Sequence, residues 1–532
     1  MPLDAKLTYL SCDQRKRSLL GQHWLGLLSV GFVVTLSLLA FIALSGWQGE
    51  AAATDLWHDP WFWQVVRFSL WQATLSAILS VLLAMPIARA LALDRNLIGS
   101  QAFISWCLLC FVMPSLILIT GIVALFGRSG TLSPWLGEGW RLYGLNGILL
   151  AHLFLNLPFA IRILTLQWQS IPTAAWKLSA QLGLGRWQAF RVVEWPVLRG
   201  VLPAVAGFIF LLCFNSFAVV LALGGGPHAS TLEVAIFQSL KYDFNPSEAL
   251  FLAWTQLLLA GSIYLMISRL GSFQWLAPAQ TGQDRWLPQL SITSLWMGRV
   301  GYLLAWLYLT LPILVLFPLA FQADWQLLIN SGLLAIVLRS LCLALSATLV
   351  ALILGLSILS LWASVRQSRW SVLISSVALY PLVVPTMVLS VGIYLLLMPY
   401  WDWHRWGWVA IIGMNAVVVL PFVFKQLNAQ VANYHQQYAR LQSDLNLDRL
   451  TCWLKIYLPY LKPVLLQVIA MSFVFALGDM SIFAIFGNDD WRTLPWLIYT
   501  LAGSYRLAEA ALVSLLLLAC AFVALRWLER GR

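Results

Sequence analysis

The chain has 532 residues, of which 61% are hydrophobic and only 10% are charged, and it contains 29 tryptophans. A mean hydropathy of +0.82 belongs to a polytopic membrane protein and excludes a set of soluble domains. The formal net charge of +11 is therefore interpreted first in terms of membrane topology rather than nucleic-acid binding.

Apolar stretches of about 20 residues, the length that crosses a bilayer as a helix, recur along the whole chain. They predict an all-α polytopic membrane protein with about twelve transmembrane helices. A polar segment precedes the first span without the small-residue site of a cleaved signal peptide, so we expect this helix to be retained. The predicted spans are residues 25–46, 65–88, 102–126, 145–167, 198–222, 249–269, 300–321, 334–362, 371–398, 407–427, 461–486 and 508–527.

Basic residues are unevenly distributed between alternate connecting segments. With the N-terminus inside, about three quarters of the 32 Lys and Arg fall in segments predicted to be cytoplasmic. This bias follows the positive-inside rule and predicts that both termini are cytoplasmic. The positive charge thus indicates orientation in a lipid bilayer, and we expect no nucleic-acid partner.

The second half of the sequence repeats the first. The order of the related strings is the same in both halves, and one loop between the third and fourth spans is shorter in the second half. The pairs are MPSLILITGI at Met113 with VPTMVLSVGI at Val384, SLWQATLSAILS at Ser69 with SLCLALSATLVA at Ser340, LPFAIR at Leu157 with LPFVFK at Leu420, Pro196 with Pro459, and Thr231-Leu232 with Thr493-Leu494.

Six spans in each half make a parallel repeat, in which both halves begin on the cytoplasmic side and enclose one pathway. The predicted division is a cytoplasmic N-terminal segment at 1–24, a first repeat at 25–270, a cytoplasmic linker at 271–298 and a second repeat at 299–532. A duplication without a pathway is the alternative, but twelve duplicated spans are typical of transporters.

The loop between the fourth and fifth spans contains QLGLGRWQAFRVVEWPVL. Gly183 permits a backbone with positive φ and predicts a sharp break between two helices. After the break, Arg186, Trp187 and Phe190 belong to a short amphipathic helix that ends near Pro196. Such a helix lies on the membrane surface, binds anionic lipid, or docks in a groove of a partner protein.

The same loop of the second half reads DLNLDRLTCWLKIYLPYL. Asn446 stands at the position of the glycine, and asparagine is the other residue that tolerates positive φ. Arg449, Trp453 and Pro459 then match the arginine, the phenylalanine and the proline of the first half. Both halves are therefore predicted to carry the same turn and short helix.

This loop resembles the cytoplasmic coupling motif of binding-protein-dependent ABC import permeases, because the spacing from Gly183 to Pro196 matches that motif. Lys177-Leu178-Ser179 replaces its Glu-Ala-Ala. The resemblance implies a type I ABC importer permease fold, with each loop seated on one of two copies of an ABC ATPase. The chain has no G-x-x-x-x-G-K-[ST] phosphate loop, so ATP and Mg²⁺ are expected on that partner, with no catalytic residue and no cofactor here.

Two further strings, SFAVVLALGGGPHASTLEVAIFQSLKYDFN and ALGDMSIFAIFGNDDWRTLPWLIYTLAGSYR, are similar to the thiamine and thiamine pyrophosphate import permeases of Gram-negative bacteria. That resemblance implies the inner membrane, a periplasmic thiamine-binding protein and import of thiamine and its phosphate esters. The strings lie at the outer ends of the fifth and eleventh spans. Their receptor-facing candidates are Gly225, Gly226, Asp489, Asp490 and Arg492; a helix stop with solvated charges is the alternative.

Asp479 is predicted to lie well inside an apolar span, where an ionisable group usually faces a cavity or a partner. Asn215 and Ser216 occupy the related place in the first half. The three residues are candidates for the substrate path or a gate, and packing between the halves is the alternative for the acid. Thiamine carries a thiazolium cation, which a carboxylate or an aromatic face attracts.

Two rival functions share much of this pattern. A permease for ferric iron or another small solute has the same architecture, and an ion-coupled secondary transporter also fits twelve spans in parallel halves. The second class usually needs more buried ionisable residues than Asp479 and Arg339. The cysteines and histidines show no metal-ligand spacing, so no metal site is expected.

Overall fold

The computed structural model describes residues 24–46, 53–137, 139–226, 229–270, 286–288, 291–366, 368–382, 384–444 and 453–529. Every regular element within these ranges is a helix. The elements of the first half are α2 (Trp24–Gly46), η1 (Ala53–His58), α3 (Pro60–Leu93), α4 (Ser100–Val112), α5 (Ser115–Phe126), η2 (Ser133–Trp135), α6 (Leu145–Ser170), α7 (Thr173–Gln181), α8 (Arg186–Ala189), η3 (Phe190–Glu194), α9 (Trp195–Leu198), α10 (Leu202–Phe214), α11 (Ala218–Leu223), α12 (Leu232–Lys241) and α13 (Pro246–Leu270).

The second half has a related order of elements, and its first helix begins inside the segment predicted as a linker. Residues 271–285 and 289–290 of that linker lie outside the described residues. The elements are α14 (Ile292–Leu314), α15 (Leu316–Ala320), α16 (Trp325–Asn330), α17 (Leu333–Ser364), α18 (Trp370–Leu379), η5 (Tyr380–Leu382), α19 (Thr386–Leu397), α20 (Trp403–Asp444), η6 (Trp453–Tyr457), α22 (Leu458–Leu477), α23 (Ser481–Phe486), η7 (Asp489–Trp491), α24 (Leu494–Gly503) and α25 (Leu507–Glu529).

Nine helices in the described ranges are long and apolar enough to cross a membrane, and three bent helix pairs raise the number to 12. The prediction of an all-α protein with about twelve spans is confirmed. Two of the spans are sharply bent, because α4 meets α5 at 101° and α18 meets α19 at 90°. Pro114 and Pro385 stand at these bends. A proline disfavours helical backbone in the residue before it, which accounts for both breaks.

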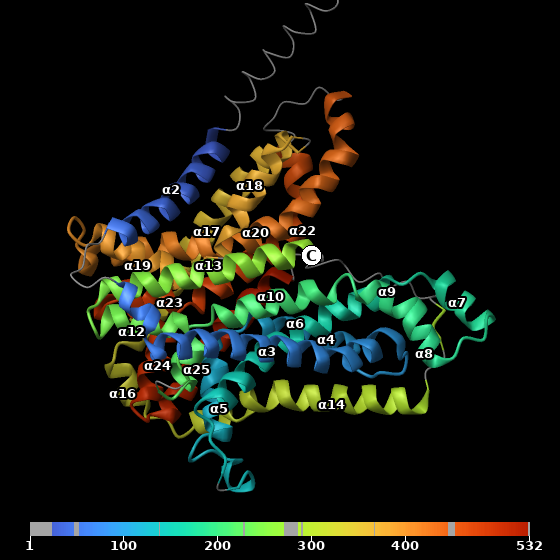
Figure 1. Ribbon diagram of the computed structural model, residues 1–532, viewed down its shortest axis with the longest axis horizontal. Helices are drawn as coiled ribbons and strands as arrows, with labels where there is room; N and C mark the ends of the chain where they lie inside the picture. The colour runs from blue at the N-terminus through green and yellow to red at the C-terminus, as the bar shows by residue number, and fades with distance from the viewer. Residues whose placement is uncertain are drawn as a thin grey trace, which may run out of the picture.

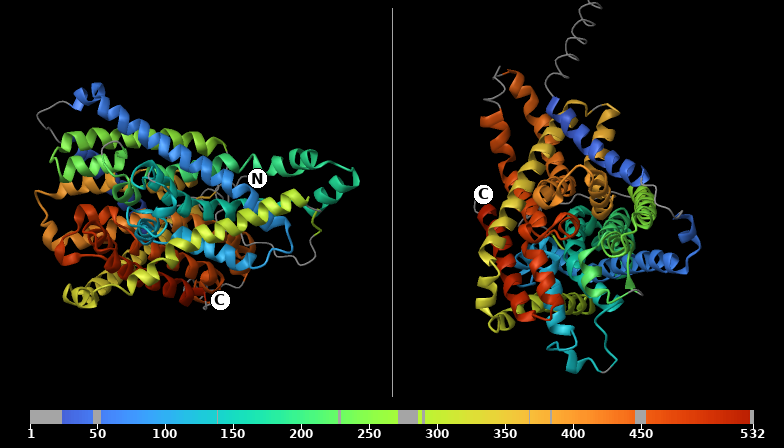
Figure 2. Two further views of the ribbon diagram at one scale, coloured as in Figure 1. Left: turned by 90° about the horizontal axis from the view of Figure 1, so that it is seen from below. Right: turned by 90° about the vertical axis from the view of Figure 1, so that its left-hand side faces the viewer.

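The first helix of each half packs on the other half (Figures 1 and 2). Helix α2 lies against α17 and α19, and α14 lies against α3 and α5. A glycine makes each approach close: a Cβ atom built on Gly26 would stand 2.6 Å from the Cβ of Leu361, and one on Gly298 would stand 2.6 Å from the Cβ of Ala90. The halves therefore interlock through related helices.

A pair of equivalent hydrogen bonds relates the two halves. The backbone N–H of Leu232 donates to Ser69 Oγ at 3.0 Å, and the N–H of Leu494 donates to Ser340 Oγ at 2.8 Å. All four residues belong to the strings that define the sequence repeat. In each half this bond ties the start of a short helix, α12 or α24, to the long second span, α3 or α17.

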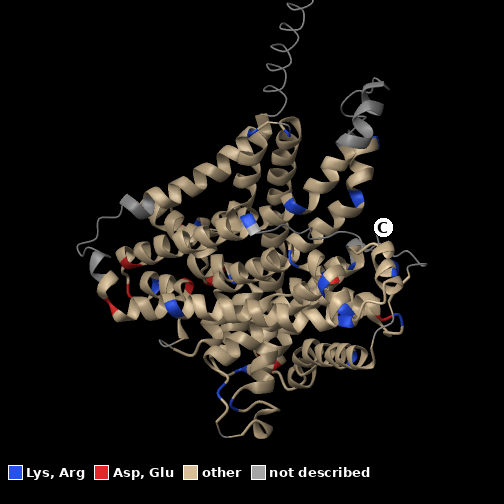
Figure 3. Cartoon of the chain, turned by 45° about the vertical axis from the view of Figure 1, so that its right-hand side comes forward, with Lys and Arg blue, Asp and Glu red and all other residues tan. Residues whose placement is uncertain are grey.

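Short helices lie at opposite sides of the molecule. Helices α7, α8 and α9 project at the right of Figure 1, whereas α12, α16 and α24 lie at the left. The largest group of acidic residues lies at the left of Figure 3, and most Lys and Arg lie away from it. The charge asymmetry of the sequence is thus also an asymmetry in space.

Candidate functional site

The first long loop, defined here as residues 171–201, contains α7, α8, η3 and α9. Helix α7 ends in a Schellman motif, in which the N–H of Leu184 donates to the carbonyl of Ser179 at 3.1 Å and Gly183 takes φ +61. A β-carbon would strain this left-handed backbone. The predicted sharp break at Gly183 is confirmed, and it turns the chain so that α8 leaves at an angle to α7.

An exposed apolar surface follows this break. Trp187 is 71% exposed, and its ring stacks on that of Phe190 with 5.7 Å between centroids. Val192 and Trp195 are also exposed, and Pro196 lies in the first turn of α9. Large exposed apolar groups on a projecting loop are typical of a surface that another molecule covers.

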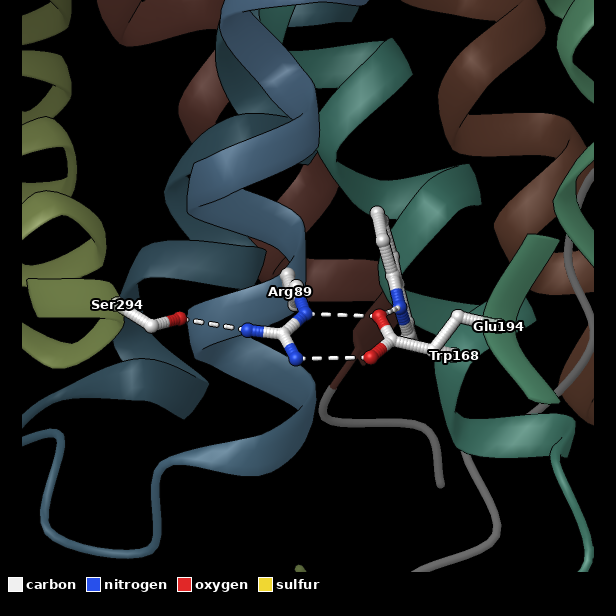
Figure 4. A network of polar contacts seen from close by, with 4 residues as sticks. All are labelled: Arg89, Trp168, Glu194 and Ser294. Carbon is white, nitrogen blue, oxygen red and sulfur yellow. Dashed lines mark hydrogen bonds and ion pairs between the residues drawn. The ribbon is translucent and has the colours of Figure 1, made fainter. Parts of the chain in front are cut away.

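An ionic network fastens this loop to the bundle (Figure 4). The guanidinium of Arg89 on α3 donates from Nε and Nη2 to the two carboxylate oxygens of Glu194, at 2.7 and 2.8 Å. The indole Nε1 of Trp168 on α6 donates to the same carboxylate at 2.7 Å. The third guanidinium nitrogen, Nη1, donates to Ser294 Oγ on α14 at 2.6 Å. One arginine and one glutamate therefore join the loop, α3, α6 and α14.

Glu194 is a functional candidate that the sequence prediction missed. Its side chain is 1% exposed, and a carboxylate is buried at this level only when charged or hydrogen-bonding groups pair with it. The signal was present in the string VVEWP, where one acid interrupts an apolar run. Its partner, Arg89, is distant in the sequence, and nothing in the local pattern indicates the pairing.

A second link between the loop and α14 is weaker and exposed. Arg186 Nη1 donates to Thr293 Oγ1 at 3.3 Å. Beyond the loop, Arg299 of α14 pairs with Asp94 at the end of α3, at 2.8 Å. Burial raises the pKa of Asp94, but the bonds from Arg299 and from the N–H of Asn96 outweigh this effect and hold the pKa below its ordinary value.

The second long loop, defined here as residues 435–459, is described only in part. Asn446 and Arg449 lie outside the described residues. The backbone of Trp453 begins the π-helix η6, its side chain lies outside the described residues, and Pro459 lies in the first turn of α22. The predicted turn at the asparagine therefore stays a prediction.

Aromatic rings occupy the place of the ionic network in the second half. Tyr457 precedes Pro459 as Glu194 precedes Pro196, and its ring lies 4.8 Å from that of Tyr434, edge to face. Tyr434 also contacts Tyr460, with 5.5 Å between the centroids. In the register of the repeat, Ser360 of α17 stands where α3 has its arginine. The two loops are thus related in sequence but attached by different chemistry.

Asp479 lies at a helix break, so the span predicted at residues 461–486 is interrupted there. Helix α22 ends at Leu477 and α23 begins at Ser481. The carboxylate accepts a hydrogen bond from the N–H of Ile482 at 3.1 Å, so it satisfies a free donor of the first turn. Gly478 is the C-cap residue of α22, and its backbone keeps right-handed helical angles.

The first half has a break at the related place. Helix α10 ends at Phe214 and α11 begins at Ala218, so Asn215 and Ser216 lie between them. Asn215 Nδ2 donates to the carbonyl of Leu382 at 3.5 Å, and Gln256 Nε2 donates to Asn215 Oδ1 at 3.4 Å. The structure therefore places the predicted path residues at two matching breaks.

These breaks contact the proline bends of the opposite half. Asn215 reaches Leu382, just before the bend of the second half, and a Cβ atom on Gly478 would stand 2.9 Å from the Cβ of Pro114 in the bend of the first half. Lys241 adds another contact between halves, because its Nζ donates to the carbonyl of Ile485 at 3.0 Å and lies 5.1 Å from the ring centroid of Tyr394. Interrupted helices thus meet where the halves face each other.

The receptor-facing candidates of the first half lie next to a cavity. Gly225 and Gly226 both have positive φ, of 72° and 129°. Gly225 lines a cavity of about 840 Å³ together with Arg128, Arg141 and Tyr143. A Cβ atom on Gly225 would stand 2.7 Å from the Cβ of Tyr143, so glycine lets the two loops meet.

The candidates of the second half form local ion pairs. Arg492 Nη2 donates to Asp489 Oδ1 at 2.7 Å, and Asp490 Oδ2 lies 3.6 Å from His404 Nδ1. All four side chains are exposed. The surface pairs add little stability, and they leave an accessible group of charges beside η7.

Comparisons with curated proteins give long matches, while no family model matches the chain. The thiamine transport system permease protein of Salmonella typhimurium is 36% identical, over 95% of this chain and 96% of that protein. The Escherichia coli protein of the same description is also 36% identical, with the same two shares. The Brucella abortus protein is 35% identical, over 92% of each chain.

Proposed function

Since the chain belongs to the family of thiamine transport system permease proteins, we propose that it is the membrane subunit of an ATP-driven importer of thiamine and its phosphate esters. The observation that carries this proposal is the similarity over 95% of the chain. In the proposed assembly, two copies of a separate ATPase bind the cytoplasmic side and a separate periplasmic protein delivers the substrate.

The first long loop supports an ATPase contact. It projects from the bundle (Figure 1), and Trp187 in α8 presents an exposed ring. Exposed aromatic residues next to an arginine, here Arg186 and Arg191, are frequent energetic centres of protein interfaces. In the proposed function, this loop and its counterpart around Trp453 each seat in one ATPase subunit and follow its movement.

The paired helix breaks support a path between the halves. Irregular backbone at membrane depth is tolerated where it lines a cavity or is buried in protein. We assign Asn215, Ser216 and Asp479 to the wall or gate of this path. The thiazolium cation of thiamine would be attracted by the carboxylate of Asp479 when the halves separate.

The proposed orientation places both long loops and both termini in the cytoplasm of a Gram-negative bacterium, with the protein in the inner membrane. The positive-inside bias of the sequence supports this orientation. Gly225, Gly226, Asp489, Asp490 and Arg492 then face the periplasm, where the binding protein docks. A docked receptor would span both halves and release the substrate above the helix breaks.

The test is uptake of labelled thiamine at nanomolar concentration by cells that lack their own thiamine permease but keep its receptor and ATPase. With this chain supplied, uptake returns and disappears when the ATPase is inactivated. Normal membrane insertion without uptake would contradict the thiamine proposal and favour another small solute. Uptake that persists without the ATPase would contradict ATP coupling and favour an ion-coupled transporter.

A further inference from the structure

The ionic network of Figure 4 is more than a local ion pair, because its four residues come from four separate elements. Glu194 belongs to the first long loop, whereas Arg89, Trp168 and Ser294 belong to α3, α6 and α14. The loop, α3 and α6 are in the first half of the chain, whereas α14 is the first helix of the second half. The network thus stands where the loop meets both halves.

We propose that Arg89 and Glu194 are positioning residues that make the first long loop move as one body with α3, α6 and the first turn of α14. This inference rests on the proposed function, in which an ATPase moves the loop. The pair would transmit that movement to the helices that surround the path. Neither residue would contact the substrate.

The geometry of the pair favours rigid transmission. Two parallel N–H to oxygen bonds fix both the distance and the relative angle of the guanidinium and the carboxylate. The indole of Trp168 adds a third bond, and Glu194 is almost fully shielded from water. Sliding the loop past α3 would leave a buried carboxylate unpaired, which is costly, so joint movement is favoured.

The contact with the second half is equally close. Arg89 uses its remaining terminal nitrogen for Ser294, in the first turn of α14. One turn later, Gly298 lets α14 approach Ala90, the residue next to Arg89. A displacement of the loop therefore reaches α14 directly, as well as through α3, and α14 contacts α5 beyond the proline bend.

The second half has no equivalent ionic link at the aligned positions. Ser360, Tyr457 and Val431 stand where the first half has its arginine, its glutamate and its tryptophan. Contacts between aromatic rings tolerate small sliding movements, whereas a bidentate ion pair does not. Within the described residues, the proposal therefore assigns the rigid transmission to the first loop.

The experiment measures thiamine transported per ATP hydrolysed by the full chain, reconstituted in liposomes with its ATPase and its receptor. Glu194→Gln keeps the shape of the side chain and an acceptor for Trp168, but it removes the charge that pairs with Arg89. Arg89→Lys keeps the charge and removes the bidentate geometry. Asp94→Asn is the matched control, because Asp94 also joins α3 to α14, and its side chain accepts hydrogen bonds from Arg299 and Asn96, which are outside the loop.

The proposal predicts that Glu194→Gln lowers transport per ATP by about tenfold while ATP hydrolysis continues, and that Arg89→Lys lowers it about threefold. Asp94→Asn keeps the wild-type ratio. A purely structural role would reduce uptake and hydrolysis together, in proportion to the amount of assembled complex. If the Glu194→Gln variant does not assemble with the ATPase, the thiamine transported per ATP hydrolysed by the Arg89→Lys variant decides the question.

Wild-type transport per ATP in the two loop variants would overturn the proposal, and so would an equal loss in the Asp94→Asn control. Failure of the wild-type chain to transport thiamine in this system is a different result, because it would contradict the proposed function itself. The two failures are therefore distinguished in one set of liposomes.

Discussion

The two long loops of this protein occupy related positions in the sequence repeat, but the bundle holds them differently. The first is fastened by Arg89 and Glu194, with a hydrogen bond from Trp168. The second has Tyr457 at the position of the glutamate, packed edge to face against Tyr434. A duplicated fold has thus kept the loop and replaced the chemistry that attaches it.

This difference shows that the repeat preserves helix order, the close approach of the first helices and one pair of backbone hydrogen bonds, but not the ionic network at the loop. Gly26 and Gly298 bring the first helices of the two halves equally close to their neighbours, at 2.6 Å for an added Cβ. Ser69 and Ser340 accept equivalent backbone bonds. A shared architecture therefore coexists with one ionic and one aromatic attachment, which is the arrangement expected if the loops transmit movement unequally.

The largest effect is expected when the ionic attachment is broken from one side. Glu194→Ala leaves the guanidinium of Arg89 without its carboxylate in a largely buried site, and such losses cost about 3 to 5 kcal/mol. Tyr457→Phe keeps the ring and its packing and should cost less than about 1 kcal/mol. Thermal unfolding of the two purified variants in detergent measures the difference; equal shifts would contradict the contrast between the loops.

Next in size is the effect of truncating the exposed ring of the first loop. Trp187→Ala should weaken ATPase binding by about 2 kcal/mol, roughly 30-fold, because a large aromatic group is lost from the proposed contact. Stability should be unchanged, since the ring is 71% exposed. Trp135→Ala is the control, because this ring is 86% exposed but lies between α5 and α6. Co-purification with the ATPase measures binding for the two variants. An undiminished ATPase yield for Trp187→Ala would argue against docking of the ATPase at the first long loop.

The interlocked first helices should respond alike in both halves. Gly298→Val and Gly26→Val each introduce a side chain where a Cβ alone already meets another atom at 2.6 Å, and overpacking of this kind costs about 1 to 3 kcal/mol. Thermal unfolding should show similar shifts for the two variants. A large effect in one half only would show that the asymmetry of the loops extends into the membrane packing.

The smallest effect concerns the pair that joins α3 to α14 outside the loops. The pKa of Asp94 is lowered in the folded protein. Its charged carboxylate therefore stabilises the fold fully at pH values above the ordinary pKa, and this stabilisation is lost as the pH falls through the lowered pKa. Asp94→Asn should therefore lower the unfolding temperature slightly at pH 7, and its difference from the wild type should shrink as the pH falls below about 4. An unchanged acid dependence would show that Arg299 does not stabilise the carboxylate.

Much of the fold could be predicted from the sequence, because hydropathy and repetition act over long segments. The twelve spans, the all-α class and the break at Gly183 depend on local composition or on one residue with special backbone freedom. The bends at Pro114 and Pro385 were missed although each proline was visible. Apolar composition alone does not distinguish a straight span from a bent pair.

The candidate site was less predictable, because its contacts join residues far apart in the chain. Asp479 stood out in the sequence as an acid in an apolar run, but its place at a helix break depends on how α22 ends. The pairing of Glu194 with Arg89 spans 105 positions, and no periodicity indicates it. Lys241 and its contact with the carbonyl of Ile485 are similarly invisible without the packing of the two halves.

The most direct measurement of the central claim is site-specific cross-linking from α8 of the first long loop. A photoreactive amino acid replaces Trp187 in one sample and Trp135 in another, and the intact transporter is irradiated in membranes. The account predicts a cross-link to the ATPase from position 187 and none from position 135. Absence of the cross-link at 187 in an actively transporting complex would contradict the assignment of this loop as the ATPase contact.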